Sequence, residues 1–406
     1  MTAHPILTEA KKLGEYIVYC RRTLHAIAET GFDTTRTLAF IEGELRLMAI
    51  EPQSCGRAGL TALIGGGEKC LLLRADVDAL PIPEESGLEF AAKNGCSHAC
   101  GHDTHAAMLL GAAKILKKHE RELKCRVKLM FQSAEELLEG AKDMLDAGVL
   151  EDPPVSAAMM LHVMTASPLP AGTVIVPPAG VSAPAADYFT VELRGRGCHG
   201  SSPNTGIDPI TAAAQLILAL QEIPARELGM QEAAVLTVGS VHGGEAANAI
   251  PDSVIMGGTL RAMEEETREY VKSRLAEISK GIADAFRCEA EVRFGSGCPG
   301  LVNEGALAAF AERCARESLG GDRVLSAADF SAAGGRGGRT AGSEDFAYIS
   351  RRVPSLMLAL AAGETEKGFI NPLHHPAVRF DEAALPYGAA VLAFCAMEWG
   401  KHRPFA

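Results

Sequence analysis

The spacing of apolar positions changes character along the first half of the chain. From residue 5 to about residue 48, apolar residues recur at helical spacing, which predicts helices. From residue 59 onward, short apolar runs such as LLL at 71–73 alternate with segments of helical pattern at 104–118 and 134–147. A continuous apolar run favours a strand that is buried on both faces, as in parallel sheets. The alternation of strand and helix therefore predicts an α/β fold with a mainly parallel sheet.

A different order of elements occupies the middle of the chain. Between residues 183 and 295 the patterns predict strand, helix, strand, strand, helix and strand, which is the split order of ferredoxin-like units. Segments rich in Pro and Gly bound this region at both ends. We therefore expect a discontinuous α/β/α domain, made of residues 1–182 and 296–406, with a ferredoxin-like α+β domain inserted at 183–295.

Composition narrows the possible classes of protein. The 406 residues include 39 Lys and Arg against 51 Asp and Glu, which gives a formal net charge of -12. A negatively charged chain without a basic cluster argues against nucleic acid as the main partner. No apolar run approaches the roughly 18–20 residues of a membrane span. The 11 cysteines are odd in number and scattered, and the first residues lack the apolar run of a secretory signal. We therefore expect free thiols and a reducing, cytoplasmic location.

The densest group of potential metal ligands is the segment SHACGHDTH at 97–105. Thiolate and imidazole groups favour zinc and similar metals. A single glycine separates Cys100 from His102, so both side chains can turn to one side of an extended loop. The alternative is a packed cysteine in a polar loop. A structural zinc site would need a second Cys/His pair at short spacing, so the other ligands of a metal must come from distant segments.

Three later segments contain candidates for those ligands. Glu135 and Glu136 follow a buried strand, and adjacent carboxylates point in different directions, so one could bind metal while the other acts as a base on water. They could equally be acids that complement a helix dipole. His162 ends an apolar strand, where open α/β sheets place functional groups, or it is a satisfied core histidine. His374 and His375 lie in a late loop, where either could simply face solvent.

Together these groups suit a pair of metal ions. Five ligands with one bridging group are appropriate for two divalent ions about 3.5–4 Å apart. Cys and His ligands favour zinc, although manganese, cobalt or nickel could occupy such a site. Three carboxylates could orient the ligand imidazoles as hydrogen-bond acceptors, or could serve only as helix caps and solvated turns: Asp76, Asp78 and Asp103.

A series of motifs runs along nearly the whole chain. In chain order, they are LLLRADVDALP, HACGHDTHAAMLLGAAKIL, FQSAEELLEGAKDML, LHV, GRGCHGSSPNTGIDPI, GGEAANAIPD, GTLRAM, GSEDFAY and LHHPAVRFDE. These motifs resemble those of the metal-dependent aminoacylase and carboxypeptidase superfamily. The resemblance is strongest to its branch of hippurate hydrolases, N-acyl-amino-acid amidohydrolases and plant auxin-conjugate hydrolases, and the cysteine form CGHDTH separates this branch from relatives that use a bridging aspartate.

The resemblance implies a metal-binding catalytic domain in the discontinuous part of the chain and a two-metal site within it. Glu135 falls on the position of the general acid/base of the family. His374 rather than His375 is selected, because the family motif has His, one residue and then Pro. The implied metal ligands are Cys100 as the bridging group, with His102, Glu136, His162 and His374.

The resemblance also implies a homodimer that forms through the inserted domain. His199 falls on a histidine that can reach the active site of the partner and polarise the scissile carbonyl. Asn248 and Arg261 fall on positions that bind the free carboxylate of the substrate, and Arg matches a carboxylate bidentately. The implied reaction is hydrolysis of an N-acyl amino acid by metal-activated water, with N-acetyl-diaminopimelate or a dipeptide as alternative substrates within the superfamily.

Some features leave other hypotheses open. Four positions depart from the family pattern: Ile27 and Ala28 replace the His and Pro of a His-Pro-Glu motif, Ser133 replaces a proline, and Asn204 replaces a histidine near the expected substrate cleft. A second hypothesis makes Cys100 a nucleophile with a histidine base, and it predicts activity that resists chelators. A third makes the chain a catalytically silent binding protein, which turnover of any N-acyl amino acid would exclude.

Overall fold

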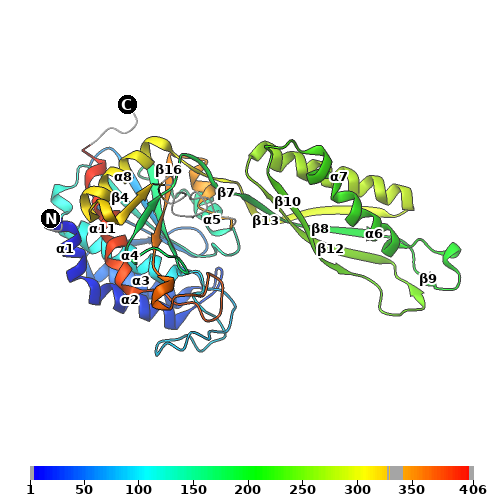
Figure 1. The fold of residues 1–406 in the computed structure, drawn as a ribbon, viewed down its shortest axis with the longest axis horizontal. Coiled ribbons are helices and arrows are strands. Elements are labelled where there is room, and N and C mark those ends of the chain that lie inside the picture. Colours follow the sequence, from blue (N-terminus) through cyan, green and yellow to red (C-terminus); the bar gives the residue numbers. More distant parts are fainter. Residues whose placement is uncertain (1–3, 327–328, 330–341, 402–406) are drawn as a thin grey trace. The chain divides into compact units, whose positions relative to one another are not determined.

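The computed structural model describes residues 4–326, 329 and 342–401, and the chain divides into two compact units. The first unit is discontinuous: it extends to Ser182 and resumes at Val302. Of the described residues, the second unit contains Ala183–Leu301 together with Gly342, Ser343 and Glu344. Figure 1 shows the elements of each unit.

The first unit is built on an eight-stranded sheet. Its strand order is β1-β2-β4-β3-β5-β16-β6-β15. The inner strands β4, β3, β5 and β16 run parallel, while β2 joins β4, and β6 joins β16, in antiparallel pairs. The bounds are β1 Pro52–Ser54, β2 Gly59–Gly65, β3 Cys70–Asp76, β4 Arg126–Gln132, β5 Ala157–Met164, β6 Val174–Val176, β15 Val324–Ser326 and β16 Ser355–Ala361. Every residue of β3 is buried, so the predicted α/β class with a mainly parallel sheet is confirmed.

Helices cover this sheet, and one of them begins at the ligand-rich segment. The helix α4 packs against the sheet and against α2 and α11. Close approach is possible because residue 111 is glycine: a Cβ there would lie 2.8 Å from Ile17 Cγ1 and 3.2 Å from Ala389 Cβ. The bounds are α1 Pro5–Lys12, α2 Gly14–Ile27, α3 Thr35–Leu47, α4 His102–Lys118, α5 Gly140–Asp146, α8 Gly305–Leu319, α10 Ala347–Ser350 and α11 Leu385–Trp399.

The predicted helix at 134–147 is wrong over its first part. The helix α5 begins only at Gly140, and the preceding residues form a turn in which Ala134 (φ 59°) and Leu138 (φ 56°) are left-handed. The carbonyl of Ala134 accepts hydrogen bonds from the amides of Glu139 and Gly140, which closes the turn. Tertiary contacts here override helical propensity, and strained backbone of this kind is concentrated at functional sites.

The second unit has a ferredoxin-like sheet of four antiparallel strands in the order β10-β12-β8-β13. The helices α6 and α7 pack against the sheet and enclose a separate apolar core. A short ribbon of β9 and β11 extends from the unit. The bounds are β8 Ala185–Arg194, β9 Cys198–His199, α6 Pro209–Leu220, β10 Ala234–His242, β11 Ala249–Ile250, β12 Ser253–Ala262, α7 Glu265–Phe286 and β13 Glu289–Cys298.

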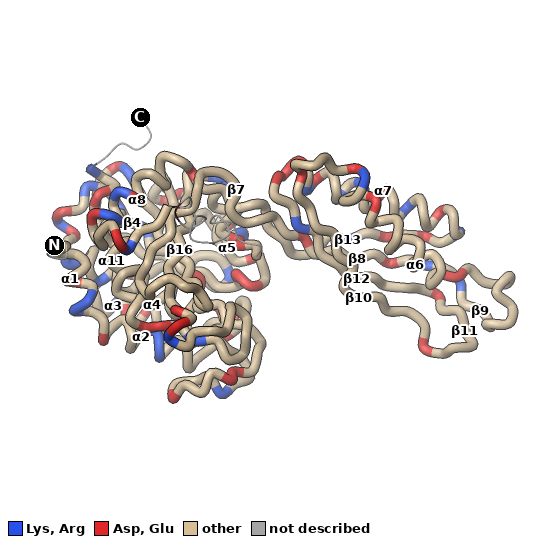
Figure 2. The backbone as a smooth tube through the Cα atoms, viewed as in Figure 1, with Lys and Arg blue, Asp and Glu red and all other residues tan. Residues whose placement is uncertain are grey.

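Charge is mixed over both units. In the view of Figure 2, Lys and Arg alternate with Asp and Glu along the helices. Among the helices that the structure describes, none is both long enough and apolar enough to cross a membrane.

Candidate metal centre

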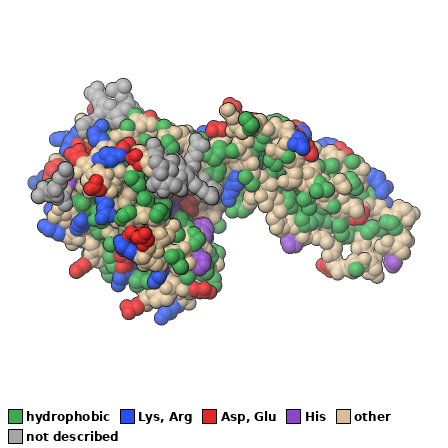
Figure 3. Space-filling model, viewed as in Figure 1, with side chains coloured by type: hydrophobic (Ala, Val, Ile, Leu, Met, Phe, Trp, Pro, Cys, Tyr) green, Lys and Arg blue, Asp and Glu red, His purple; other side chains and the backbone are tan. Residues whose placement is uncertain are grey.

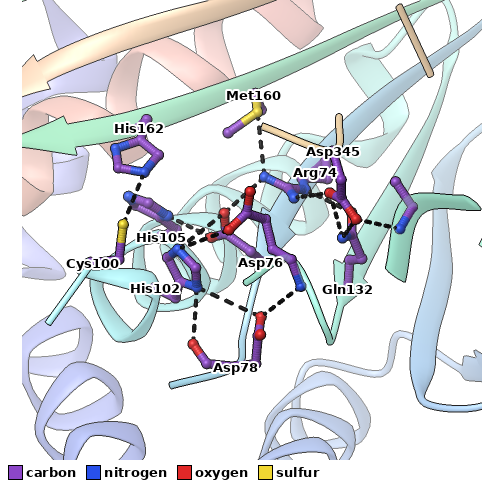
Figure 4. Close-up of polar contacts among 12 residues, drawn as sticks. Arg74, Asp76, Asp78, Cys100, His102, His105, Gln132, Met160, His162 and Asp345 are labelled. Atoms are coloured by element: carbon purple, nitrogen blue, oxygen red, sulfur yellow. Dashed lines mark hydrogen bonds and ion pairs between the residues drawn. The ribbon is translucent and has the colours of Figure 1, made fainter. Parts of the chain in front are cut away.

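Six side chains from distant segments of the first unit converge at the carboxyl ends of β3, β4 and β5. Cys100 belongs to two groups of three residues, and within each group the ligand atoms lie within 4.8 Å of one another. One group adds His102 and His162, and the other adds Glu136 and His374. Cys100 therefore occupies the position that a bridging ligand requires, and Figure 4 shows it facing His162.

Hydrogen bonding leaves one nitrogen of His102 free for a metal. Nδ1 lies 2.9 Å from the backbone carbonyl oxygen of Asp78, and a carbonyl can only accept, so Nδ1 carries the proton. Nε2 is buried and has no hydrogen-bond partner among the described residues. It lies 3.9 Å from carboxylate oxygens of both Glu135 and Glu136. A buried imidazole nitrogen without a hydrogen-bond partner, close to several acidic groups, is expected of a metal ligand.

Hydrogen bonding also leaves one nitrogen of His162 available to a metal. Its Nδ1 donates to the carbonyl oxygen of Val163 at 2.7 Å, which leaves the lone pair of Nε2 pointing toward Cys100 Sγ at 3.6 Å. Burial lowers the pKa of His162 to about 3, so the imidazole is neutral at physiological pH. Neutral imidazole is the form that coordinates metal ions.

The anionic candidates need a nearby cation. Burial raises the pKa of the Cys100 thiol. Burial, followed by the charges of Asp78 and Asp76, also raises the pKa of Glu136 to about 7, against the opposing effect of His102. Glu136 Oε1 has no hydrogen-bond partner among the described residues and lies 3.6 Å from His374 Nε2. A divalent ion would favour the thiolate and the carboxylate, so this set of donors fits a metal centre.

Asp78 holds two parts of the site in place. Its carboxylate accepts hydrogen bonds from the backbone amides of Glu135 (3.0 Å) and Glu136 (3.2 Å), and its carbonyl orients His102. These bonds stabilise the irregular turn that replaces the expected start of a helix. The turn presents both glutamates at the end of β4.

The other two predicted carboxylates have different surroundings. Asp76 accepts hydrogen bonds from Arg74 and His105, and its Oδ2 lies 3.6 Å from His102 Nε2. Asp103 accepts a hydrogen bond from Arg21 Nε and contacts His25 Nδ1, each at 2.8 Å. Neither partner is a candidate ligand. Asp103 therefore fixes the start of α4 to α2.

Asp103→Ala should destabilise the fold strongly. Arg21 is 1% exposed, and of the two carboxylates that pair with it among the described residues it would keep Glu382 alone. We therefore expect a loss of about 3 kcal/mol in the free energy of unfolding, measured by urea denaturation. Although burial opposes it, the charges of Arg21 and His25 hold the pKa of Asp103 below its usual range, so this contribution is present at neutral pH and is lost as pH falls through the folded-state pKa.

The matched control for this prediction is an exposed ion pair. Arg22 bonds the same Glu382 but its side chain is 49% exposed, so Arg22→Ala should cost less than about 1 kcal/mol. Equal stabilities of the Asp103→Ala and Arg22→Ala variants would contradict the anchoring role.

The predicted residues of the second unit lie at two ends of its sheet. His199, on β9, accepts a hydrogen bond at Nδ1 from the backbone amide of Ser201 at 3.1 Å, so its proton is on Nε2. The ribbon places Asn248 beside it, because the Asn248 carbonyl accepts from the Gly200 amide. Arg261 lies near the far end of β12, where it donates to the hydroxyl of Ser343.

Sequence reasoning missed several residues that support the site. They share deep burial and a place in one hydrogen-bond network beside the ligands (Figure 4). The only signal in the sequence was an arginine within the apolar run of β3 and a third histidine in the ligand-rich segment. The missed residues are Arg74, His105, Gln132 and Asp345.

Three comparisons show which known proteins the chain is similar to. Residues 72–398 match the model of peptidase family M20/M25/M40. The chain is 37% identical over 377 residues to the N-acetyl-L-cysteine deacetylase of Bacillus subtilis (strain 168), covering 92% of this chain and 85% of that protein. It is 36% identical over 398 residues to the IAA-amino acid hydrolase ILR1-like 2 of Arabidopsis thaliana, covering 96% and 86%. The crystal structure of a dinuclear metal-binding peptidase from Bacillus subtilis superposes with a TM-score of 0.78 at 31% identity, covering 96% of this chain and 99% of that one.

Proposed function

The chain belongs to peptidase family M20/M25/M40 and is a metal-dependent hydrolase of amide bonds, and we propose that it cleaves N-acyl amino acids into a carboxylic acid and a free amino acid. The observation that carries the proposal is the meeting of two ligand groups at Cys100, beside the carboxylate of Glu135. The relatives named for N-acetyl-L-cysteine and for IAA-amino acids support the substrate class.

The proposed centre holds two divalent ions, zinc or manganese, at the ligands Cys100, His102, Glu136, His162 and His374. When bound, these ions would act as Lewis acids and lower the pKa of a water molecule. Both glutamates lie 3.9 Å from His102, and Glu136 also lies 3.6 Å from His374, which suits Glu136 as a ligand. Glu135 is the carboxylate beside this ligand set, and in this proposal it takes a proton from the attacking water and delivers it to the leaving nitrogen.

The second unit would supply contacts to the substrate. His199 carries its proton on Nε2, so it can donate a hydrogen bond to the carbonyl oxygen as negative charge develops there. Arg261 and Asn248 would bind the free carboxylate. The burial of Cys100 disfavours the alternative of a cysteine nucleophile, because burial raises the pKa of the thiol, whereas an activated nucleophile needs a low pKa.

The distance between His199 and Arg261 supports a homodimer. In the strand β12, Arg261 lies eight residues beyond Ser253, which is near the ribbon. At about 3.4 Å per residue, the backbone positions of these two residues are about 27 Å apart. An N-acyl amino acid is much shorter, so the two side chains can contact one substrate only if they come from different chains. The strand β10 is an edge of the sheet and exposes Val235 (58%) and Val241 (48%), and apolar side chains gather on the visible face of the unit (Figure 3).

Mixed dimers test this arrangement. His199→Ala and Glu135→Gln homodimers should each be nearly inactive. In a mixture refolded together, half of the dimers would contain one complete site, so we expect about a quarter of wild-type activity. If His199 served its own chain, no dimer in the mixture would contain a complete site, and the mixture would stay inactive.

A release assay over a panel of substrates tests the proposed reaction. The panel contains N-acetyl, N-benzoyl and indole-acetyl amino acids, N-acetyl-diaminopimelate and dipeptides, with metal content measured on the same sample. We expect release of free amino acids from the N-acyl compounds. Turnover of dipeptides alone would overturn the assigned substrate class.

A further inference from the structure

His105 lies against two of the candidate ligands, yet neither of its nitrogens is free. Its ring centroid is 5.4 Å from that of His102 and 4.5 Å from that of His162. Nε2 lies 2.9 Å from the backbone nitrogen of Val163, and a backbone amide can only donate, so Nε2 accepts. The proton is therefore on Nδ1, which donates to Asp76 Oδ1 at 2.5 Å. Figure 4 shows His105 between these groups.

These two hydrogen bonds span a gap in the sheet. The strands β3 and β5 pair from Leu71 only as far as Arg74, whose partner is Met160. Beyond that point β3 continues beside β4, and β5 continues beside β16. Asp76 and Val163 thus lie on strands that have separated, and His105 joins them. Gaps of this kind at the carboxyl ends of parallel strands are where α/β sheets place their sites.

The Asp76 end of this connection is firmly anchored. Asp76 Oδ2 accepts from Arg74 Nη1 at 2.8 Å, and Arg74 Nη2 donates to Asp345 Oδ1 at 3.0 Å. The side chains of all three residues are fully buried. A continuous chain of hydrogen bonds therefore runs from Asp345 to the amide of Val163, the residue that follows His162.

We propose that His105 is a positioning residue of the metal centre, and this inference rests on the proposed function. By joining Asp76 to the amide of Val163, it sets the separation of β3 and β5, and with it the distance between His102 and His162. Asp76, His102 and His105 are themselves close enough to surround an ion. The use of both His105 nitrogens argues against His105 as a ligand.

Zinc binding to the metal-free protein tests the role. Zinc is titrated against a competing chelator, and unfolding temperatures of the metal-free proteins are measured in parallel. His105→Leu should bind zinc about 10–100-fold more weakly but with unchanged stoichiometry at saturation. His105→Gln retains a donor and an acceptor and should recover most of the affinity. His105→Asn can replace only the hydrogen bond to Asp76, so its zinc affinity should lie between those of the leucine and glutamine variants. This variant is used for the test if His105→Leu does not fold.

A buried histidine of the same segment provides the matched control. His98 is 2% exposed, and neither of its nitrogens has a hydrogen-bond partner among the residues described, so His98→Phe should leave zinc affinity nearly unchanged. The proposal would be overturned if His105→Leu bound zinc with wild-type affinity or lost one zinc per chain. It would also be overturned if His98→Phe or His105→Gln weakened zinc binding as much as His105→Leu does. If the wild type binds neither zinc nor, in the same titration, manganese, the proposed function is refuted instead.

Discussion

Replacing Glu135 with Gln should abolish most of the turnover while the metal ions remain bound. The amide side chain has nearly the same shape, and the backbone hydrogen bond to Asp78 does not depend on it. What the variant lacks is a group that can accept a proton from water and return it to the leaving nitrogen. Loss of a general base lowers kcat by about 10²–10⁴-fold. The measurement is kcat and metal content on the same preparations of wild type and variant.

Glu139 provides the control for this variant. It is exposed and lies in the turn that precedes α5, so Glu139→Gln should keep wild-type kcat. A Glu135→Gln enzyme with its metal and more than about a tenth of the wild-type kcat would contradict the role of Glu135 as base. Loss of metal from the variant would instead identify Glu135 as a ligand.

Replacing Cys100 with Ala should impair both metal positions at once. Cys100 belongs to both ligand groups, so its removal leaves each group one donor short. Changes to residues that only support ligands weaken metal binding by about 10–100-fold, so loss of a shared ligand should cost more than about 100-fold and remove activity at ordinary metal concentrations. Metal content and activity are measured together, with circular dichroism as a check on folding.

Two further variants make this result specific. Cys96 is half-buried and belongs to neither ligand group, so Cys96→Ser should keep metal and activity. Cys100→Asp should recover part of the metal binding, because a carboxylate can also bridge two ions. An inactive Cys100→Ala protein that keeps two metal ions would favour a nucleophilic cysteine instead.

The sequence predicted the fold class and the convergence of six side chains because both depend on local signals. Continuous apolar runs indicated buried parallel strands, and potential ligands stood next to the ends of those strands. His102 could be proposed as a ligand because it stands beside Cys100 in a segment rich in Cys and His, and His162 because it ends an apolar strand, where α/β sheets place functional groups.

Other features depend on contacts between distant segments and left no local signal. The segment after β4 has helical spacing, but the carboxylate of Asp78 holds the amides of Glu135 and Glu136 in a turn. Asp103 stands in the ligand-rich segment, yet its partners come from α2, 82 and 78 residues away in sequence. Which polar side chains meet is decided by packing, and spacing along the chain does not reveal it.

The dependence of hydrolysis on metal content tests the central claim most directly. Metal is removed from the wild-type protein with a chelator and returned in measured amounts, while hydrolysis of an N-acyl amino acid is followed. The two ligand groups that share Cys100 predict an inactive metal-free protein whose activity is restored fully near two ions per chain, in accordance with two-metal catalysis. Full activity in protein shown to contain no metal would contradict the assignment of this site.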